Sequence, residues 1–334
     1  MKSNRIVFSE PGKVAFIDDE IPDDPPPGEI LVATEATLIS TGTETTCLRG
    51  DFDEDTSWAA WTKFPMTPGY SNAGRVLKVG EGVTGSSPGD RVATAGGHQR
   101  FFTFPADDPA IARIPDSVSD EDATWAVIAF VVQTGVRRAE HAMGDTAAVI
   151  GLGPLGQLAV QYLRTLGLSQ ILAIDPFQMR LDQALAHGAT AGFCGSAADA
   201  HDFVADQTGG RLVDVVYDIT GNCEVLPLAL KLPRNFGKLI LIGDTAHPYR
   251  QRITQDVLIR GLTIIGTHNA KLPPEHAFWT HGRQMSLFLE YVCRGSIRVS
   301  DLVTHRFSPE DAQKAYTLLE EDRASTLGVI FDWR

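Results

Sequence analysis

The chain has 334 residues, of which 43% are hydrophobic and 31 are glycine, and its formal net charge is −13. This length suggests two domains, and the composition is typical of a soluble α/β protein and excludes a disordered or fibrous one. The strong negative charge argues against nonspecific binding to nucleic acid or to anionic membranes.

The first third of the chain, to about Pro115, is predicted to form short strands broken by turns. Its strand-like stretches are IVFSEPGKVAFIDDE, EILVATEATLIS and GRVLKVGEGV, which are rich in β-branched residues and punctuated by Gly and Pro. From Ser119 the pattern changes. The stretch SDEDATWAVIAFVVQTGVRRAE predicts one long, largely buried helix that begins with a capping serine and ends near Arg137 and Arg138.

An alternation of strands and helices follows. Predicted strands TAAVIGL, QILAID, AGFCG, LVDVVYDITG, GKLILIGD and GLTIIGTH are joined in part by helices such as PLGQLAVQYLRTLG and QMRLDQALAHG. Strands that are apolar on both faces, with helices between them, indicate a parallel, doubly wound sheet. The tail from about Asn269 predicts two helices, GRQMSLFLEYVCRG and SPEDAQKAYTLLEED, and a last strand, LGVIFDW, that return to the first domain.

The cysteines give no sign of a cross-linked or metal-bound framework. Cys47, Cys194, Cys223 and Cys293 are scattered, with no C-x-x-C pair. The opening MKSNRIVFSEPGK lacks the apolar segment of a secretory signal. We therefore expect a cytoplasmic protein with free thiols and no membrane partner.

A glycine-rich turn between the first strand and helix of this alternation predicts a dinucleotide site. Gly151, Gly153 and Gly156 form G-x-G-x-x-G, which allows a tight turn, backbone approach to a pyrophosphate and close helix packing. Asp175 ends the next strand, where its carboxylate can accept hydrogen bonds from a ribose and repel a 2′-phosphate. This combination favours NAD (NADH) over NADP.

Arg180 leaves an alternative open, because it could cover the adenine, pair on the surface or tolerate a 2′-phosphate. The expected cofactor contacts are Gly151, Gly153, Pro154, Leu155, Gly156, Asp175, Arg180, Thr220, Gly243 and Thr267.

Nearly the whole chain resembles the medium-chain dehydrogenase/reductase superfamily, of the alcohol and polyol dehydrogenase type. The resemblance rests on PGEILVATEATLISTGTE, PGYSNAGRVLKVGEGVTGSSPGDRV, GDTAAVIGLGPLGQLAVQYLRTLG, AIDPFQMRLDQALAHGA and DVVYDITGN. It implies a GroES-like β-rich catalytic domain (1–120), a Rossmann NAD-binding domain (121–268) and a C-terminal return (269–334). The motifs FSEP, STGTE and PGY look most like the bacteriochlorophyllide dehydrogenase branch.

In zinc-dependent members, a Cys, a His (often followed by Glu) and a third Cys or Glu hold the catalytic metal. The resemblance places these slots at Ser40 or Thr41, at Tyr70 with Ser71 in the neighbouring Glu slot, and near Val127. Zinc needs thiolate, imidazole or carboxylate ligands, and none stands there. The stretch GDRVATAGGHQRFFTF also runs straight through where a structural-zinc loop would insert. We therefore expect a zinc-free member.

Without a metal, hydrogen-bond donors or a general base must support alkoxide chemistry. Thr43 occupies the family's proton-relay position and Tyr70 a position that faces the substrate, and both are expected to be catalytic. His268 follows the last Rossmann strand and is a candidate general base. We expect all three to converge on the nicotinamide. The competing interpretations are a turn threonine, a packing aromatic that fills the vacated metal space, and a structural histidine.

The remaining candidates are predicted to line the substrate pocket. Glu44 is more consistent with local hydrogen bonding than with catalysis, and Asn269 follows His268. Trp58, together with Trp61, is a candidate for a substrate wall or for core packing. His98 is a second candidate base.

The sequence thus predicts a zinc-independent NAD-dependent dehydrogenase that interconverts a secondary alcohol, such as a polyol or sugar, and a ketone. The alternatives are a zinc-free quinone or enoyl reductase and a non-catalytic NAD-binding protein. The resemblance implies that strands at the edge of the Rossmann sheet pair across a two-fold axis. LILIGD and LTIIGTH are apolar enough to do so, and we therefore expect a homodimer, or a tetramer of two such dimers. The expected partner is otherwise only a small-molecule substrate.

Overall fold

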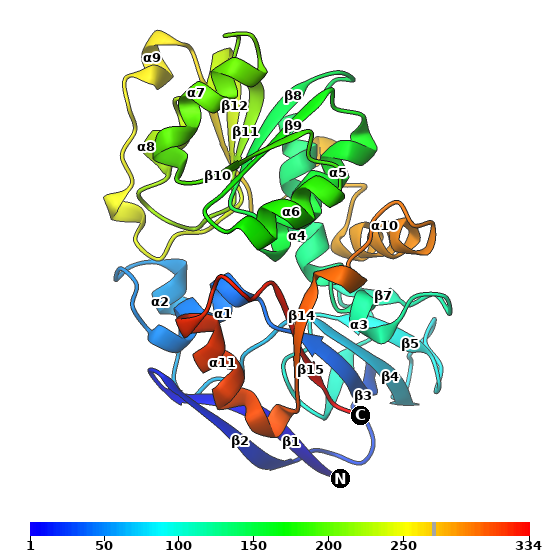
Figure 1. Cartoon of the computed structure of the whole chain (residues 1–334). Helices are drawn as coiled ribbons and strands as arrows, with labels where there is room; N and C mark the ends of the chain where they lie inside the picture. Colours follow the sequence, from blue (N-terminus) through cyan, green and yellow to red (C-terminus); the bar gives the residue numbers. More distant parts are fainter. Residues whose placement is uncertain (269–271) are drawn as a thin grey trace. The chain divides into compact units, whose positions relative to one another are not determined.

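The computed structural model describes residues 1–268 and 272–334. These residues divide into two compact units (Figure 1). The first comprises residues 1–51, 55–130 and 278–334, and the second comprises 52–54 and 131–277. The chain thus passes between the units at 51/52, 54/55, 130/131 and 277/278.

The first unit is built mainly of antiparallel strands. Its larger sheet has the order β14-β15-β3-β4-β5-β7, with β6 also paired to β3, and a separate hairpin joins β1 to β2. The strands are β1 (Lys2–Glu10), β2 (Lys13–Glu20), β3 (Glu29–Leu38), β4 (Asn72–Val79), β5 (Arg91–Thr94), β6 (Phe101–Pro105), β7 (Ile111–Arg113), β14 (Val303–Phe307) and β15 (Gly328–Asp332).

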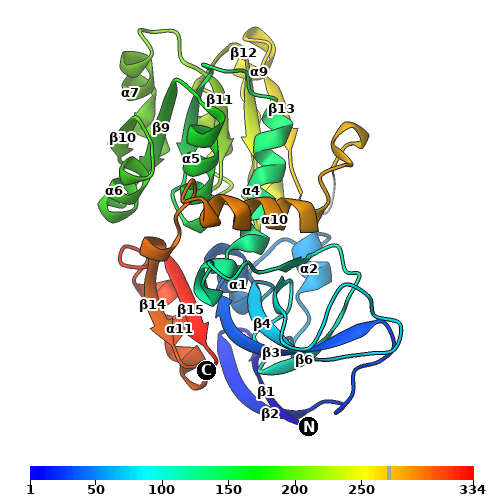
Figure 2. The same ribbon diagram turned by 90° about the vertical axis from the view of Figure 1, so that its right-hand side faces the viewer.

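The C-terminal return supplies part of this same sheet. Strand β15 pairs antiparallel with β3, with Phe331 opposite Thr37, and parallel with β14. Figure 2 shows α11 (Ala312–Glu321) beside these two strands. The unit's other helices are α1 (Thr41–Arg49), α2 (Ser57–Trp61), α3 (Asp120–Ala123) and α10 (His281–Cys293).

The second unit confirms the predicted doubly wound parallel sheet. Its order is β10-β9-β8-β11-β12-β13 among the described residues, with every pairing parallel. The strands are β8 (Thr146–Ile150), β9 (Gln170–Asp175), β10 (Ala191–Cys194), β11 (Val213–Asp218), β12 (Pro233–Leu241) and β13 (Thr263–Gly266). The helices are α4 (Ala126–Ala139), which starts in the first unit, α5 (Pro154–Leu166), α6 (Gln178–Ala186), α7 (Ala200–Gln207), α8 (Leu226–Ala229) and α9 (Asp256–Ile259).

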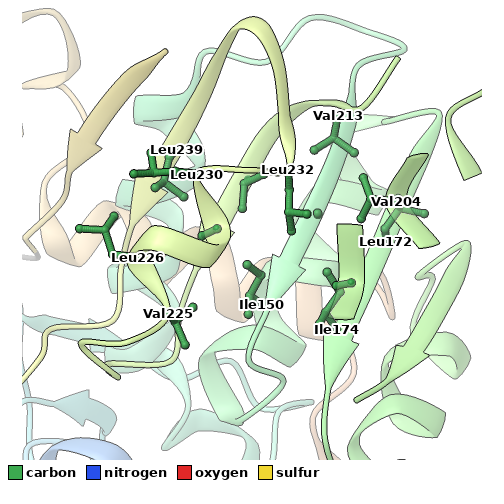
Figure 3. Close-up of a cluster of buried hydrophobic side chains, with 14 of the residues drawn as sticks. Ile150, Leu172, Ile174, Val204, Val213, Val225, Leu226, Leu230, Leu232 and Leu239 are labelled. Carbon is green, nitrogen blue, oxygen red and sulfur yellow. The ribbon is translucent and has the colours of Figure 1, made fainter. Parts of the chain in front are cut away.

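One buried apolar cluster holds α7 and α8 against the parallel sheet (Figure 3). Ile150, Ile174 and Leu239 from the strands meet Val204 and Leu230 from the helical side, and all are at most 3% exposed. Burying such side chains contributes roughly 1.5–3 kcal/mol each. Ile150, the last residue of β8, belongs to this cluster, so the packing anchors the strand end directly before the glycine turn at Gly151.

The single long helix expected from Ser119 is wrong. The structure has two helices, α3 and α4, separated at Thr124 and Trp125. The Thr124 hydroxyl donates to the Glu121 carbonyl at 2.6 Å, and Trp125 is fully buried. Burial of this large indole and the local side-chain bond override the helical propensity of the stretch. In the described part of the chain, no helix is long and apolar enough to cross a membrane.

Candidate functional site

Three hydroxyl groups gather at the start of α1 in the first unit. Ser40 is the N-cap of α1, which places Thr43 in the first turn. The phenol of Tyr70 donates to Ser40 Oγ at 2.5 Å and is also hydrogen-bonded to the Thr43 side chain. We call Ser40, Thr43 and Tyr70 the hydroxyl cluster. It brings together the predicted relay threonine and the tyrosine that stands in a metal slot.

The electrostatics of the cluster keep the phenol protonated. Burial raises the pKa of Tyr70 to about 12, and the negative charge of Glu44 acts in the same direction, while hydrogen bonds from Ser40 and Thr43 oppose the shift. At neutral pH Tyr70 is therefore a neutral hydrogen-bond donor and not a base.

The chain reaches Tyr70 through a glycine that cannot be replaced without strain. Gly69 has φ +90°, in the left-handed region. A Cβ there would also lie 2.7 Å from Cδ2 of His98. Gly69 thus lets the His98 ring pack against the backbone directly before the cluster.

The residues at the other metal slots do not fit zinc. Val127 is apolar and buried in α4, and Ser71 is fully buried in the extended segment that leads into β4. Across residues 1–268 and 272–334, no group of three or more His, Cys, Asp or Glu side chains could hold a metal ion. The donor set at this place consists of hydroxyl groups, which are poor zinc ligands.

The two tryptophans near the cluster differ in exposure. Trp58 is 7% exposed, whereas Trp61 at the end of α2 is 49% exposed. The Trp61 ring lies 6.3 Å from the Tyr70 ring, tilted by 51°. Both are candidates for a substrate wall or for core packing, and Trp61 is the one that combines exposure with proximity to the cluster. Both belong to the stretch WAAW, so their difference in exposure comes from the packing of α2 and not from the sequence pattern.

Glu44 and His98 lie inside the first unit. His98 is fully buried, with Nε2 2.9 Å from Glu44 Oε2 and Nδ1 2.7 Å from Thr37 Oγ1. Both ring nitrogens are therefore engaged with protein groups. This geometry favours a positioning role for His98 over direct contact with substrate.

In the second unit, the glycine turn opens directly into α5. Gly151 has φ +89°, and Gly153 is the N-cap, with no side chain bonded across the helix start. A Cβ on Gly156 would lie 2.0 Å from the Gly151 carbonyl, so only glycine allows this close packing. The free N–H groups at the start of α5 form a cradle that fits a pyrophosphate.

Asp175 is tied to this turn. One carboxylate oxygen accepts the Leu152 N–H at 2.7 Å, and the other accepts the Phe177 N–H at 2.9 Å. Each oxygen keeps a further lone pair that can accept from a ribose hydroxyl. The Arg180 guanidinium lies 5.0 Å from the centre of the Phe177 ring, a cation–π contact.

The other expected cofactor residues follow the carboxyl ends of neighbouring strands. Thr220 follows β11, and its hydroxyl donates to Asp218 at 2.7 Å. Gly243 follows β12, where a Cβ would lie 2.4 Å from the Gly221 nitrogen. Thr267 follows β13 and donates to the Leu241 carbonyl at 2.9 Å. In open parallel sheets this edge is where nucleotides bind.

His268 is exposed at the end of the same edge. Asn269 lies outside the described residues, so its predicted place in the pocket stays a prediction.

Comparison with known proteins identifies the two units. A model for the alcohol dehydrogenase GroES-like domain matches residues 26–115, and a model for zinc-binding dehydrogenase matches residues 154–279. L-threonine 3-dehydrogenase of Bacillus licheniformis is 26% identical, with 82% of this chain and 86% of that protein covered. Sorbitol dehydrogenase 1 of Saccharomyces cerevisiae is 27% identical, with 76% and 78% covered.

Two solved structures have the same fold and carry nicotinamide cofactors. A zinc-binding dehydrogenase of Sinorhizobium meliloti bound to NADP superposes with a TM-score of 0.82 at 20% identity, covering 99% of both chains. An alcohol dehydrogenase of E. coli CFT073 complexed with NADH gives a TM-score of 0.83 at 22% identity, again covering 99% of both. The chain is an oxidoreductase of the medium-chain dehydrogenase type. Within that class it is an alcohol/polyol dehydrogenase-like protein.

Proposed function

We propose that this enzyme is a zinc-independent, NAD(H)-dependent dehydrogenase that interconverts a secondary alcohol and a ketone on a polyol, a sugar or a similarly hydroxylated compound. The observation that carries the proposal is the hydroxyl cluster. Tyr70 and Thr43 occupy positions where zinc-dependent relatives would hold or serve a metal, and they are hydrogen-bonded into one group. The similarity to sorbitol and threonine dehydrogenases supports a hydroxylated substrate. The short motifs FSEP, STGTE and PGY favour the bacteriochlorophyllide dehydrogenase branch.

Oxidation removes a hydride from the carbinol carbon and a proton from its hydroxyl group. A nicotinamide dinucleotide, which Gly151, Gly153 and Asp175 would hold, would supply the hydride acceptor. Tyr70, neutral because burial raises its pKa, would turn its one O–H from Ser40 to the substrate oxygen as negative charge develops there. Thr43 can pass a proton through its hydroxyl, and we propose His268 as the general base of the reaction.

The preference for NAD rests on Asp175. Its carboxylate is buried and held by two backbone N–H groups, so it cannot easily turn away from an incoming 2′-phosphate. Charge repulsion and lost ribose hydrogen bonds would then disfavour NADPH.

A substrate screen tests the proposed reaction. We expect NAD⁺ reduction with at least one polyol or sugar alcohol, and a loss of turnover in Tyr70→Phe and His268→Ala with NADH binding retained. Tyr249→Phe, at an exposed tyrosine in the second unit, is the matched control. Turnover only of quinones or enones with NADPH would contradict the proposal.

A further inference from the structure

Glu44 is a buried carboxylate held by three hydrogen-bond donors. It is 1% exposed. Oε1 accepts the Ser40 backbone N–H at 2.7 Å, while Oε2 accepts from His98 Nε2 at 2.9 Å and from the Tyr316 hydroxyl at 2.5 Å. A buried charge is tolerated only when it is hydrogen-bonded in this way. Three donors on a single carboxyl group hold both of its oxygens in place.

The next bonds fix where the protons lie. The Trp333 indole can only donate, and its Nε1 lies 3.0 Å from Thr37 Oγ1. Thr37 Oγ1 lies 2.7 Å from Nδ1 of His98, so the Thr37 hydroxyl can donate its own proton to that nitrogen. Because a carboxylate only accepts, Nε2 of His98 carries the ring proton. Every proton in the chain from Trp333 to Glu44 has an acceptor when His98 is neutral.

These groups come from distant parts of the sequence. Tyr316 lies on α11, and Trp333 follows β15, so both belong to the C-terminal return. They bond to Glu44 on α1 and to Thr37 on β3. The return therefore adds two donors to the interior beneath the hydroxyl cluster, besides completing the sheet.

The network touches both ends of the hydroxyl cluster. At one end, Glu44 holds the backbone of Ser40, whose side chain receives the Tyr70 proton. At the other, the His98 ring packs on Gly69, the residue before Tyr70. A shift of Glu44 or His98 would therefore move the partners of Tyr70 without any contact to substrate.

We propose that Glu44 is a positioning residue that, with neutral Nε2–H His98 and with Tyr316, fixes the hydroxyl cluster. Glu44 and His98 then take no proton from the substrate. The expected effect of this positioning on turnover rests on the proposed function. The tautomer of His98 and the influence of Glu44 on Tyr70 do not depend on it.

The proton arrangement is tested by ¹⁵N-histidine NMR on the whole protein at pH 7.5. The His98 signal is assigned by its loss in His98→Gln, or by its shift in Tyr316→Phe if that variant does not fold. We expect the neutral Nε2–H tautomer. A neutral Nδ1–H ring or an imidazolium would overturn the assignment.

The influence of Glu44 and Tyr316 on Tyr70 is tested by ¹³C NMR of protein labelled at tyrosine Cζ. The Tyr70 signal is assigned by its loss in Tyr70→Phe. Glu44→Gln and Tyr316→Phe should each shift this signal. Tyr316 donates to Glu44 and Tyr70 donates to Ser40, so a shift in Tyr316→Phe would have to pass through Glu44. Glu290→Gln, at an exposed glutamate on α10, is the control for the charge change. Leu230→Ala, in the core of the second unit, controls for lost stability alone. Neither control should move the Tyr70 signal.

An unmoved Tyr70 signal in both Glu44→Gln and Tyr316→Phe would overturn the positioning role. With a substrate in hand, Tyr316→Phe should lower kcat about 10-fold or more while leaving NADH affinity unchanged, because small misplacements of reacting groups are costly. Unchanged kcat despite a moved signal would also overturn the role. If no substrate is turned over, the proposed function fails, yet both NMR measurements still decide the network.

Discussion

The phenol of Tyr70, the residue after the left-handed Gly69, donates a hydrogen bond to Oγ of Ser40, the N-cap of α1, at 2.5 Å. In a zinc-dependent relative this region would hold a cation. Here it holds neutral donors over a buried carboxylate, Glu44, whose charge is already satisfied by three protein groups. In the zinc-independent mechanism that we propose, stabilisation of substrate charge comes from hydrogen bonds.

Tyr70→Phe should lower turnover about 10²–10³-fold, because a donor to the developing charge is lost. NADH affinity should stay nearly unchanged, since the glycine turn and Asp175 are untouched. Steady-state kinetics and NADH titration of intrinsic fluorescence measure the two effects separately. Wild-type turnover in Tyr70→Phe would show that this side chain only packs.

Asp175→Ser should weaken NADH binding and strengthen NADPH binding. Each lost ribose hydrogen bond costs roughly 1–3 kcal/mol, which corresponds to about 10-fold or more in affinity. Asp175→Asn removes the charge while keeping an acceptor, so it separates repulsion from hydrogen bonding. Tighter NADPH binding by the wild type would contradict the assignment.

Low pH should destabilise the second unit through Asp214. Burial raises the pKa of its carboxyl group, but hydrogen bonds from Arg234 and Thr146 outweigh burial and hold the pKa at about 2, against an ordinary value of 3.8. A lowered folded-state pKa stabilises the fold above pH 3.8 by about 2 kcal/mol, and this is lost as the pH falls through 2. Chemical denaturation from pH 6 to about pH 2 should show a smaller loss in Asp214→Asn than in the wild type, because this carboxyl group no longer titrates. The exposed Asp202→Asn should behave like the wild type.

We expect a homodimer formed through β13. This strand lies at the edge of the parallel sheet, and large apolar side chains near it are exposed, including Phe236 at 78% and Leu258 at 87%. Pairing two such edges would bury them. Light scattering should give about twice 36.2 kDa at micromolar concentration. Leu258→Lys should dissociate the dimer, whereas Met143→Lys, at another exposed apolar site, should not. A wild-type mass near that of the monomer would contradict pairing.

Sequence reasoning reached the features that are local. The glycine turn and Asp175 are close in the chain, and their spacing alone defines a strand, a turn and a helix. The alternation of apolar strands and helices likewise gave the parallel sheet, which the structure confirms. Gly69 likewise lies in the short motif PGY, which is visible in the sequence alone.

The features that the sequence did not predict depend on packing between segments that are far apart in the chain. Glu44 and Tyr316 are 272 positions apart, and no periodicity connects them. From the sequence, His98 is a candidate base. Its burial depends on contacts with Gly69 and with Phe331, whose ring lies edge-to-face at 5.1 Å, and no sequence pattern indicates these contacts. The break between α3 and α4 similarly follows from the burial of Trp125.

The most direct test of zinc independence is the turnover of protein from which metal has been removed by exhaustive chelation, with zinc content determined on the same sample. We predict no stoichiometric zinc before treatment and full turnover after it, because hydroxyl groups occupy the ligand positions. One tightly bound zinc per chain, lost together with activity and restored with it, would contradict the account.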